Sequence, residues 1–256
     1  MITVGVDSGN KNTKAVVLKD GKVIGKSLIL TGFDANESAT KAYELALKDA
    51  GVTAADVAAV ASTGVGRVEV KFAKDNVTEV GSAARGAKFL MPNVNTVIDL
   101  GAEEGRAIKL NPDGKIADFA VNEKCAAGAG SFVESMSRAL QTTVEEMGPL
   151  SMKYSKEVPM NAQCVVFAES EVVSLIHQQT AKEDIARAVH DGISNRVSSM
   201  VRRVGMVDDL GLIGGPARNI GLVQSLKDDL AKDITVPEDP DYVSALGAAI
   251  YATEIA

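Results

Sequence analysis

The chain contains two cysteines, Cys125 and Cys164, and both lie in surroundings that suit a metal-cluster ligand. Each cysteine precedes a helix-like pattern, where free backbone N–H groups and the helix dipole stabilise a thiolate and a negatively charged cluster. Small residues follow Cys125 from Ala126 to Gly130 and would let a bulky inorganic group approach the backbone. A cubane iron–sulfur cluster normally takes four thiolates. One chain supplies two of them, and a symmetric dimer would supply all four.

Two simpler interpretations of the cysteines remain open. A free cysteine is most often a small buried hydrophobic residue. A disulfide would need an oxidising compartment, but the chain opens on residues 1–6, a strand-like run without a basic segment ahead of it. We therefore expect a cytoplasmic protein with reduced thiols.

Two short loops have the composition of phosphate-binding turns. Asp7 and Asp99 each end an apolar strand, and a glycine two positions later, Gly9 or Gly101, permits a tight hairpin. Two such loops facing one another could hold a nucleoside triphosphate through backbone N–H groups, with Mg²⁺ on the carboxylates. Lys14 would add positive charge near the phosphates. A single Asp-x-Gly is also an ordinary turn, so the evidence lies in the matched pair.

The two loops belong to an internal repeat. Residues 4–18 and 96–110 each show a strand, a glycine turn and a second strand, and each copy is followed by an Asp-Gly-Lys turn. A basic residue stands seven positions after the aspartate in both copies, as Lys14 and as Arg106. Chance similarity of two hairpins is the alternative. The repeat favours a duplicated lobe.

A third glycine-rich turn, from Gly214 to Asn219, follows the apolar run 210–213 and precedes a helix-like segment. Its glycines could let the backbone pack against an adenine or a ribose, although Gly-Gly-Pro is also a plain strand-to-helix turn. The small residues of 244–249 predict close helix packing with an added hinge role. His177 and His190 are isolated in the sequence, and we expect no catalysis from either.

The remaining patterns place these motifs on strands and helices and divide the chain into two lobes. Pro92 and Asn93 break the chain before the second copy of the repeat. We expect one lobe from residues 1–92 with 238–256, and a second lobe from 93–237 that carries both cysteines. The expected helices are 37–50, 81–89, 182–204, 220–230 and a last one from about 242; strands outside the repeat are expected at 57–61, 210–213 and 234–236, with a glycine-rich turn at 63–67.

Composition excludes several classes of function. The 256 residues are 46% apolar and 24% charged, without a long uninterrupted apolar run, so we expect a globular protein with no membrane partner. The net charge of −7 argues against general binding to nucleic acid. Aromatic residues make up only 4% and tryptophan is absent, so stacking platforms for bases are not expected to be central.

Taken together, the paired loops, the Gly-Gly turn and the small-residue C-terminal helix resemble the actin, Hsp70 and sugar-kinase superfamily. That superfamily has an α/β fold in which two ribonuclease-H-like lobes close on ATP. Within it, the segments 122–128 and 164–172 are similar to the signature of the activator ATPases of 2-hydroxyacyl-CoA dehydratases and the ATP-binding subunits of benzoyl-CoA reductases, the BadF/BadG/BcrA/BcrD type. The resemblance covers essentially the whole chain, and ordinary sugar kinases lack the cysteine motifs.

The resemblance implies an ATP-driven one-electron donor. In that family a [4Fe–4S] cluster bridges two subunits, with two cysteines from each, and a helix leads away from each cysteine. Nucleotide binding and hydrolysis change the angle between those helices and lower the effective potential of the cluster, so that one electron passes to a partner iron–sulfur dehydratase or reductase. The resemblance also implies reduced ferredoxin or flavodoxin as the donor, and a homodimer or a heterodimer with a related subunit.

One segment departs from the dehydratase-activator pattern. Activators usually carry Gln-Asp after the second phosphate loop, where this chain has Ala102, Glu103, Glu104 and Gly105. This form is more similar to one type of benzoyl-CoA reductase subunit. Glu104 is the substitute that we expect to orient the hydrolytic water.

The sequence thus predicts an ATPase coupled to low-potential electron transfer. A small-molecule kinase of the same fold and a nucleotide-dependent filament protein are the rivals. The predicted catalytic residues are Asp7, Asp99 and Glu104, and the predicted cluster ligands are Cys125 and Cys164. The residues predicted to bind ATP or ADP with Mg²⁺ are Ser8, Gly9, Asn10, Lys11, Asn12, Lys14, Gly101, Ala102, Gly214, Gly215, Pro216 and Asn219.

Overall fold

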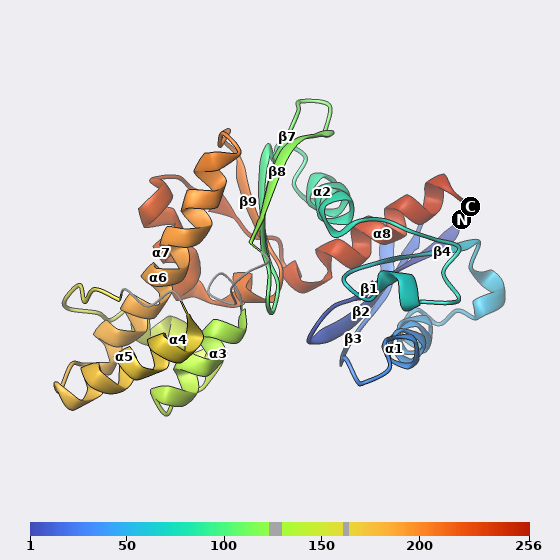
Figure 1. Cartoon of the computed structure of the whole chain (residues 1–256). Helices are drawn as coiled ribbons and strands as arrows, with labels where there is room; N and C mark the ends of the chain where they lie inside the picture. Colours follow the sequence, from blue (N-terminus) through green and yellow to red (C-terminus); the bar gives the residue numbers. More distant parts are fainter. Residues whose placement is uncertain (123–129, 161–163) are drawn as a thin grey trace. The chain divides into compact units, whose positions relative to one another are not determined.

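The computed structural model describes residues 1–122, 130–160 and 164–256, which divide into two compact units (Figure 1). Unit 1 comprises Met1–Val94, Leu110–Ile116 and Pro237–Ala256. Unit 2 comprises Asn95–Lys109 and Ala117–Val236. None of the helices within the described ranges has the length and apolar character needed to cross a membrane.

Unit 1 is built on a five-stranded sheet with the order β3-β2-β1-β4-β5. β1 is antiparallel to β2 and parallel to β4. Consecutive residues of β2, such as Val16 and Val17, are both buried, because helices cover both faces of the sheet. The strands are β1 (Ile2–Ser8), β2 (Asn12–Lys19), β3 (Lys22–Leu30), β4 (Ala59–Thr63) and β5 (Asp75–Asn76).

Two helices cover opposite faces of this sheet, as Figure 1 shows. Val17 packs with the alanines of α1 (Ala35–Ala50), whereas Val16 packs with those of α8 (Val243–Glu254). α8 lies so close to β1 that a Cβ on Gly5 would be 2.0 Å from the carbonyl oxygen of Ala245. α2 (Glu79–Leu90) packs against α8 in the same way, through Gly247. The packing predicted for the small residues of the last helix is therefore confirmed.

Unit 2 contains a second five-stranded sheet, with the order β10-β9-β6-β7-β8. Read from the other edge, the order is the same as in unit 1: the first strand of each unit lies at the centre, between its hairpin partner and a parallel strand. The duplicated α/β fold predicted from the repeat is confirmed. The strands are β6 (Thr96–Leu100), β7 (Gly105–Leu110), β8 (Ile116–Asn122), β9 (Leu210–Ile213) and β10 (Ile234–Thr235).

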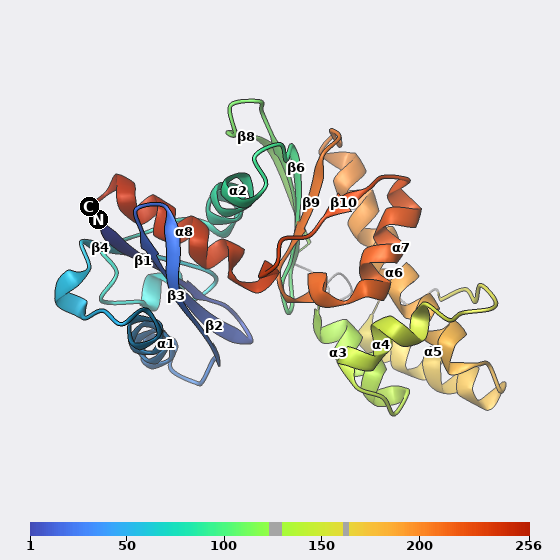
Figure 2. The same ribbon diagram turned by 180° about the vertical axis from the view of Figure 1, so that it is seen from behind.

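One continuous apolar core joins the sheet of unit 2 to all its helices. α6 and α7 pack against each other, and α3, α4 and α5 gather beside the N-terminal half of α6 (Figure 2). Phe132 and Met136 of α3, both fully buried, connect the sheet with this group. The helices are α3 (Gly130–Ala139), α4 (Val144–Ser151), α5 (Val165–His177), α6 (Lys182–Arg203) and α7 (Ile220–Leu230).

The patterns read from the sequence located most elements within a few residues, and the helix-like pattern predicted after Cys125 corresponds to α3, but they did not predict α4. α4 contains Gly148 and Pro149, which have low helix propensity. It begins at a capping box in which Thr143 and Glu146 exchange hydrogen bonds between side chain and backbone. Short 3₁₀ turns occur at Ala54–Asp56, Arg67–Glu69, Gly215–Arg218 and Pro240–Tyr242.

Candidate functional site

The first phosphate-type loop connects β1 and β2 in unit 1. Asp7 and Lys14 are cross-strand partners in this hairpin, and Lys14 Nζ lies 3.0 Å from Asp7 Oδ2. Asp7 is only 8% exposed. The spacing of seven residues between acid and base is thus a consequence of hairpin register, which places the two side chains side by side on the same face.

A turn that the sequence did not assign to the site lies against this loop. The N–H of Gly66 donates to the carbonyl of Ser8 at 2.9 Å, and a Cβ on Gly64 would be 2.5 Å from Asp7 Oδ1. Arg67 holds the turn by donating to the carbonyl of Gly64 at 3.0 Å. The only sequence signal was the Gly-x-Gly pattern at the end of a buried strand, which is too common to identify a contact with Asp7.

The predicted nucleotide-binding residues of unit 1 fall into two groups. Gly9 closes the hairpin by donating to the carbonyl of Asn12 at 3.2 Å, while Asn10 and Lys11 are exposed at the tip of the loop. The hydroxyl of Ser8 is buried beneath Gly66 and has no hydrogen-bond partner among the described residues. The Ser8 side chain therefore packs under the loop, and the exposed tip is the part that faces solvent.

The second loop, in unit 2, also pairs its aspartate with a basic residue across the hairpin, and here that residue is an arginine. Arg106 is the cross-strand partner of Asp99, and its Nη1 lies 3.1 Å from Asp99 Oδ2. The Nη2 of the same guanidinium forms an ion pair with Glu104. Asp99 and Arg106 are 5% and 8% exposed, so one buried guanidinium holds two carboxylates. Glu104 is thereby fixed beside Asp99, and its carbonyl accepts the N–H of Gly101 at 2.8 Å.

The Gly214–Asn219 turn meets this loop at the carboxyl ends of the parallel strands β6 and β9. Gly214 has a φ of 90°, and a Cβ there would be 2.0 Å from the carbonyl oxygen of Leu100 and 3.3 Å from Asp99 Oδ1. Glycine is therefore required for two reasons, its backbone conformation and its contact with the strand that carries Asp99. Asn219 ends the turn and caps α7, accepting the N–H groups of Gly221 and Leu222 at 3.0 and 3.1 Å.

The same loop is bonded directly to the start of α3. The N–H of Gly130 donates to the carbonyl of Gly101, and the N–H of Ser131 donates to the carbonyl of Ala102, both at 2.9 Å. A Cβ on Gly130 would also lie 3.3 Å from Cγ of Pro216. Three segments predicted separately thus meet at one point: the second loop, the Gly-Gly-Pro turn and the N-terminus of α3.

Cys164 lies at the N-terminus of α5, where its carbonyl accepts the first helical hydrogen bond from Ala168 at 2.9 Å. The residue is exposed, and its side chain does not cap the helix. This placement is the one predicted, and it is not that of a buried hydrophobic cysteine. Cys125 lies outside the described residues. Among the residues that are described, no group of three or more His, Cys, Asp or Glu side chains could hold a metal ion.

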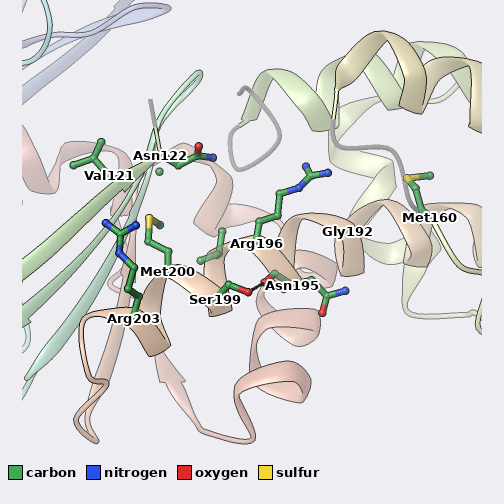
Figure 3. Close-up of a pocket in the computed structure, with 11 residues that line it drawn as sticks. Val121, Asn122, Met160, Gly192, Asn195, Arg196, Ser199, Met200 and Arg203 are labelled. Carbon is green, nitrogen blue, oxygen red and sulfur yellow. Dashed lines mark hydrogen bonds between the residues drawn. The ribbon is translucent and has the colours of Figure 1, made fainter. Parts of the chain in front are cut away.

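A cavity of about 570 Å³ lies between α6 and the end of β8 in unit 2 (Figure 3). Arg196, Met200 and Arg203 of α6 line one side, facing Asn122 of β8. Met160 lines the cavity from the segment that precedes α5. Two guanidinium groups are thus placed near Asn122 and Met160, which stand three and four positions before the two cysteines.

The described structure therefore assembles the predicted site residues into two constellations, each within its own unit. Unit 1 holds Asp7 and Lys14 over the Gly64–Gly66 turn. Unit 2 joins Asp99 and Glu104 to the Gly214 turn and to α3. Two sheets of the same strand order, each with an aspartate at the end of its central strand, define the two-lobed ATPase fold of actin, Hsp70 and the sugar kinases.

Comparison with known proteins identifies the family within this fold class. The BadF/BadG/BcrA/BcrD ATPase family matches residues 4–252. The (R)-2-hydroxyglutaryl-CoA dehydratase activating ATPase of Acidaminococcus fermentans is 37% identical over 98% of this chain and 96% of its own length. The structure of the 2-hydroxyisocaproyl-CoA dehydratase activator from Clostridium difficile, solved with bound ADPNP, is 35% identical, with a TM-score of 0.94 over 100% of this chain and 95% of that one.

More distant structures share the fold alone. A ROK family glucokinase from Streptomyces griseus, in complex with glucose and AMPPNP, covers 99% of this chain and all of its own with a TM-score of 0.66, at 14% identity. The chain belongs to the BadF/BadG/BcrA/BcrD ATPase family.

Proposed function

We propose that this protein is an ATP-dependent one-electron donor that reduces an iron–sulfur enzyme acting on a CoA ester, of the 2-hydroxyacyl-CoA dehydratase or benzoyl-CoA reductase type. ATP with Mg²⁺ would bind at the two hairpin loops. A [4Fe–4S] cluster would be shared between two subunits, each contributing Cys125 and Cys164. Full-length similarity to dehydratase activators supports this function over that of a kinase, because the likeness to kinases extends only to the fold.

The observation that carries the proposal is the bond between the second loop and α3. The carbonyls of Gly101 and Ala102 hold the first two residues of α3, and Gly130 stands five positions after Cys125. A displacement of that loop by a bound phosphate would therefore move the helix that follows the first cysteine. An electron donor driven by nucleotide requires such a connection, whereas a sugar kinase does not.

The described residues fit an iron–sulfur cluster in their donor chemistry. The thiol of Cys164 is exposed at a helix N-terminus, where free backbone N–H groups favour a negatively charged cluster. The guanidinium groups of Arg196 and Arg203 provide positive charge near the segments that lead to both cysteines. When bound, a [4Fe–4S] cluster would supply the capacity to hold and release one electron.

In this proposal, residues of both loops take part in binding and hydrolysing ATP. Asp7 and Asp99 would hold Mg²⁺ directly or through water, Lys14 would balance the charge of the phosphates, and Glu104 would orient the attacking water. The ion pairs with Lys14 and Arg106 hold these carboxylates in fixed positions before nucleotide arrives. Preorganisation of this kind lowers the reorganisation needed during phosphoryl transfer. Gly214, Gly215 and Pro216 of the third turn would contact the adenosine.

The partners follow from the same proposal. The acceptor is an iron–sulfur dehydratase or reductase, the donor is reduced ferredoxin or flavodoxin, and the subunit pairs with a second copy or with a related chain. A filament would need no cysteines at all, so iron content separates these functions.

Replacement of the cysteines tests the shared cluster. We expect anaerobically purified protein to contain about four irons per dimer, and either Cys125→Ala or Cys164→Ala to lose them, since each change removes two of four ligands. Ser170→Ala, on the exposed surface of α5, is the matched control and should retain the iron. ADP binding should survive in all three variants. A cysteine variant that kept a full complement of iron would disprove the shared cluster.

A further inference from the structure

His190 occupies the middle of α6, has no exposed surface and connects the Gly214–Asn219 turn with α4. Its Nε2 lies 3.0 Å from Nδ2 of Asn219, and its Nδ1 lies 2.9 Å from Oγ of Ser151 on α4. The Oδ1 of Asn219 accepts two backbone N–H groups, which fixes the orientation of the amide. The amide nitrogen can only donate, so Nε2 accepts and the imidazole proton resides on Nδ1.

The hydrogen bonds therefore form a chain with one direction. Asn219 donates to His190, His190 donates to Ser151, and Ser151 donates to the carbonyl of Gly148 at 2.9 Å. Burial lowers the pKa of His190 to about 3, and the positive charge of Arg187 acts in the same direction. The imidazole consequently stays neutral throughout the physiological range, and Nε2 remains an acceptor.

The side chains that form these hydrogen bonds are closely packed and have little space in which to move. A Cβ on Gly221 would be 2.0 Å from Ser151 Oγ and 2.7 Å from His190 Nδ1. A Cβ on Gly148 would be 2.8 Å from Asn219 Oδ1. α4, α6 and α7 thus meet through glycines at the point where the hydrogen bonds cross. A displacement of the turn is passed on to α4, because close-packed interfaces shift as units and do not deform freely.

α4 in turn packs against α3, and α3 packs against α5, which begins directly after Cys164. We propose that His190 is a positioning residue that transmits the position of the Gly214–Asn219 turn to α4, and through α4 to the two helices that follow the cysteines. This inference rests on the proposed function, in which that turn contacts the nucleotide. It adds a second connection between nucleotide and cysteines, in addition to the bond between the second loop and α3.

Hydrogen–deuterium exchange on the anaerobic, cluster-loaded dimer tests the inference without measuring catalysis. In the wild-type protein, ADP with Mg²⁺ should slow amide exchange both in the turn, residues 214–222, and in α4, residues 144–151. His190→Leu should keep the effect of ADP on the turn and reduce its effect on α4 at least threefold. His190→Gln should restore most of it, because the glutamine amide can accept from Asn219 and donate to Ser151.

Two further variants keep the test decisive. Ser198→Ala changes a fully buried residue on the same helix whose hydroxyl has no partner among the described residues, and it should respond like wild type. If His190→Leu does not fold, Ser151→Ala removes only the link to α4 and should give the same loss there. An α4 that responds to ADP equally in all variants, or that does not respond in wild type, overturns the role of His190. Failure of wild type to bind ADP in calorimetry would instead overturn the proposed function itself.

Discussion

At the scale of single residues, both predicted phosphate loops carry an acid that is already paired with a base. Asp7 lies against Lys14, and Asp99 lies against Arg106, at 3.0 and 3.1 Å. Each carboxylate is nearly buried, so without its partner it would be a buried charge without compensation. The base therefore holds each carboxylate in a fixed orientation at the end of its strand.

The charge of Asp7 is expected to be essential for turnover. Asp7→Asn should lower Mg²⁺-dependent ATP hydrolysis by on the order of 10²–10³, because it removes electrostatic stabilisation at the phosphates. Iron content should not change. Asp20→Asn, at the exposed end of the same hairpin, is the matched control and should hydrolyse ATP at the wild-type rate. Steady-state phosphate release measures both variants, and normal hydrolysis by Asp7→Asn would remove Asp7 from the site.

The seven-residue spacing of acid and base is visible in the sequence because hairpin register is local, although the sequence predicted Lys14 near the phosphates and not an ion pair with Asp7. A spacing of seven residues, repeated after each Asp-x-Gly, is sufficient to place the partners opposite one another. The contact of Gly64 with Asp7 and the bonds of His190 could not be predicted. Gly64 and Asp7 are 57 positions apart in the sequence, and His190 is at least 29 positions from either of its partners. Neither contact produces a periodic pattern in the sequence. His190 looks isolated in sequence because its partners come from α4 and from the turn before α7.

At the scale of secondary structure, the helices α3 to α5 are the part of the molecule that differs from a plain duplicated lobe. Unit 1 passes from β3 through a single helix, α1, to β4, whereas unit 2 passes from β8 through α3, α4 and α5 before α6. Both cysteines belong to this additional part of the sequence. The sequence does contain signals for it: apolar residues recur at Phe132 and Met136 of α3 and at Leu140 just after it, and a capping box begins α4.

The junction of the second loop, the Gly-Gly-Pro turn and α3 depends on Gly214. Gly214→Ala should lower the free energy of unfolding by more than about 2 kcal/mol, because alanine is strained at a φ of 90° and its Cβ would collide with the carbonyl of Leu100. Gly192→Ala is the matched control, since a Cβ there meets no atom within 4 Å. In the middle of α6, alanine should stabilise the protein by about 0.5–1 kcal/mol.

Chemical denaturation of the two glycine variants measures both changes. If both variants changed the free energy of unfolding by equally small amounts, the turn would tolerate a side chain and would not be held against β6. Loss of ADP binding in Gly214→Ala at temperatures where the protein remains folded would further support the turn as part of the nucleotide site.

At the scale of the whole molecule, the chain passes between the two units more than once, and its last segment, Pro237–Ala256, returns to unit 1. One predicted phosphate loop lies in each unit, whereas Cys164 and the helices that follow the cysteines lie in unit 2. In the proposed function, ATP would act on the cluster through two connections within the described part of unit 2, the bonds of Gly101 and Ala102 to α3 and the hydrogen bonds of His190. If unit 2 has two conformations, ATP can shift the equilibrium between them only as far as its affinity for the two conformations differs.

The most direct test of this account is the rate at which an iron chelator extracts iron from the reduced protein with bound ATP and Mg²⁺, compared with bound ADP, under anaerobic conditions. We expect the two nucleotides to give clearly different rates, together with different electron paramagnetic resonance spectra, and we expect reduction of the partner enzyme to require hydrolysis. Identical extraction rates and spectra in both nucleotide states, with partner reduction that is indifferent to ATP, would show that the cluster is static and would contradict the coupling of nucleotide to electron.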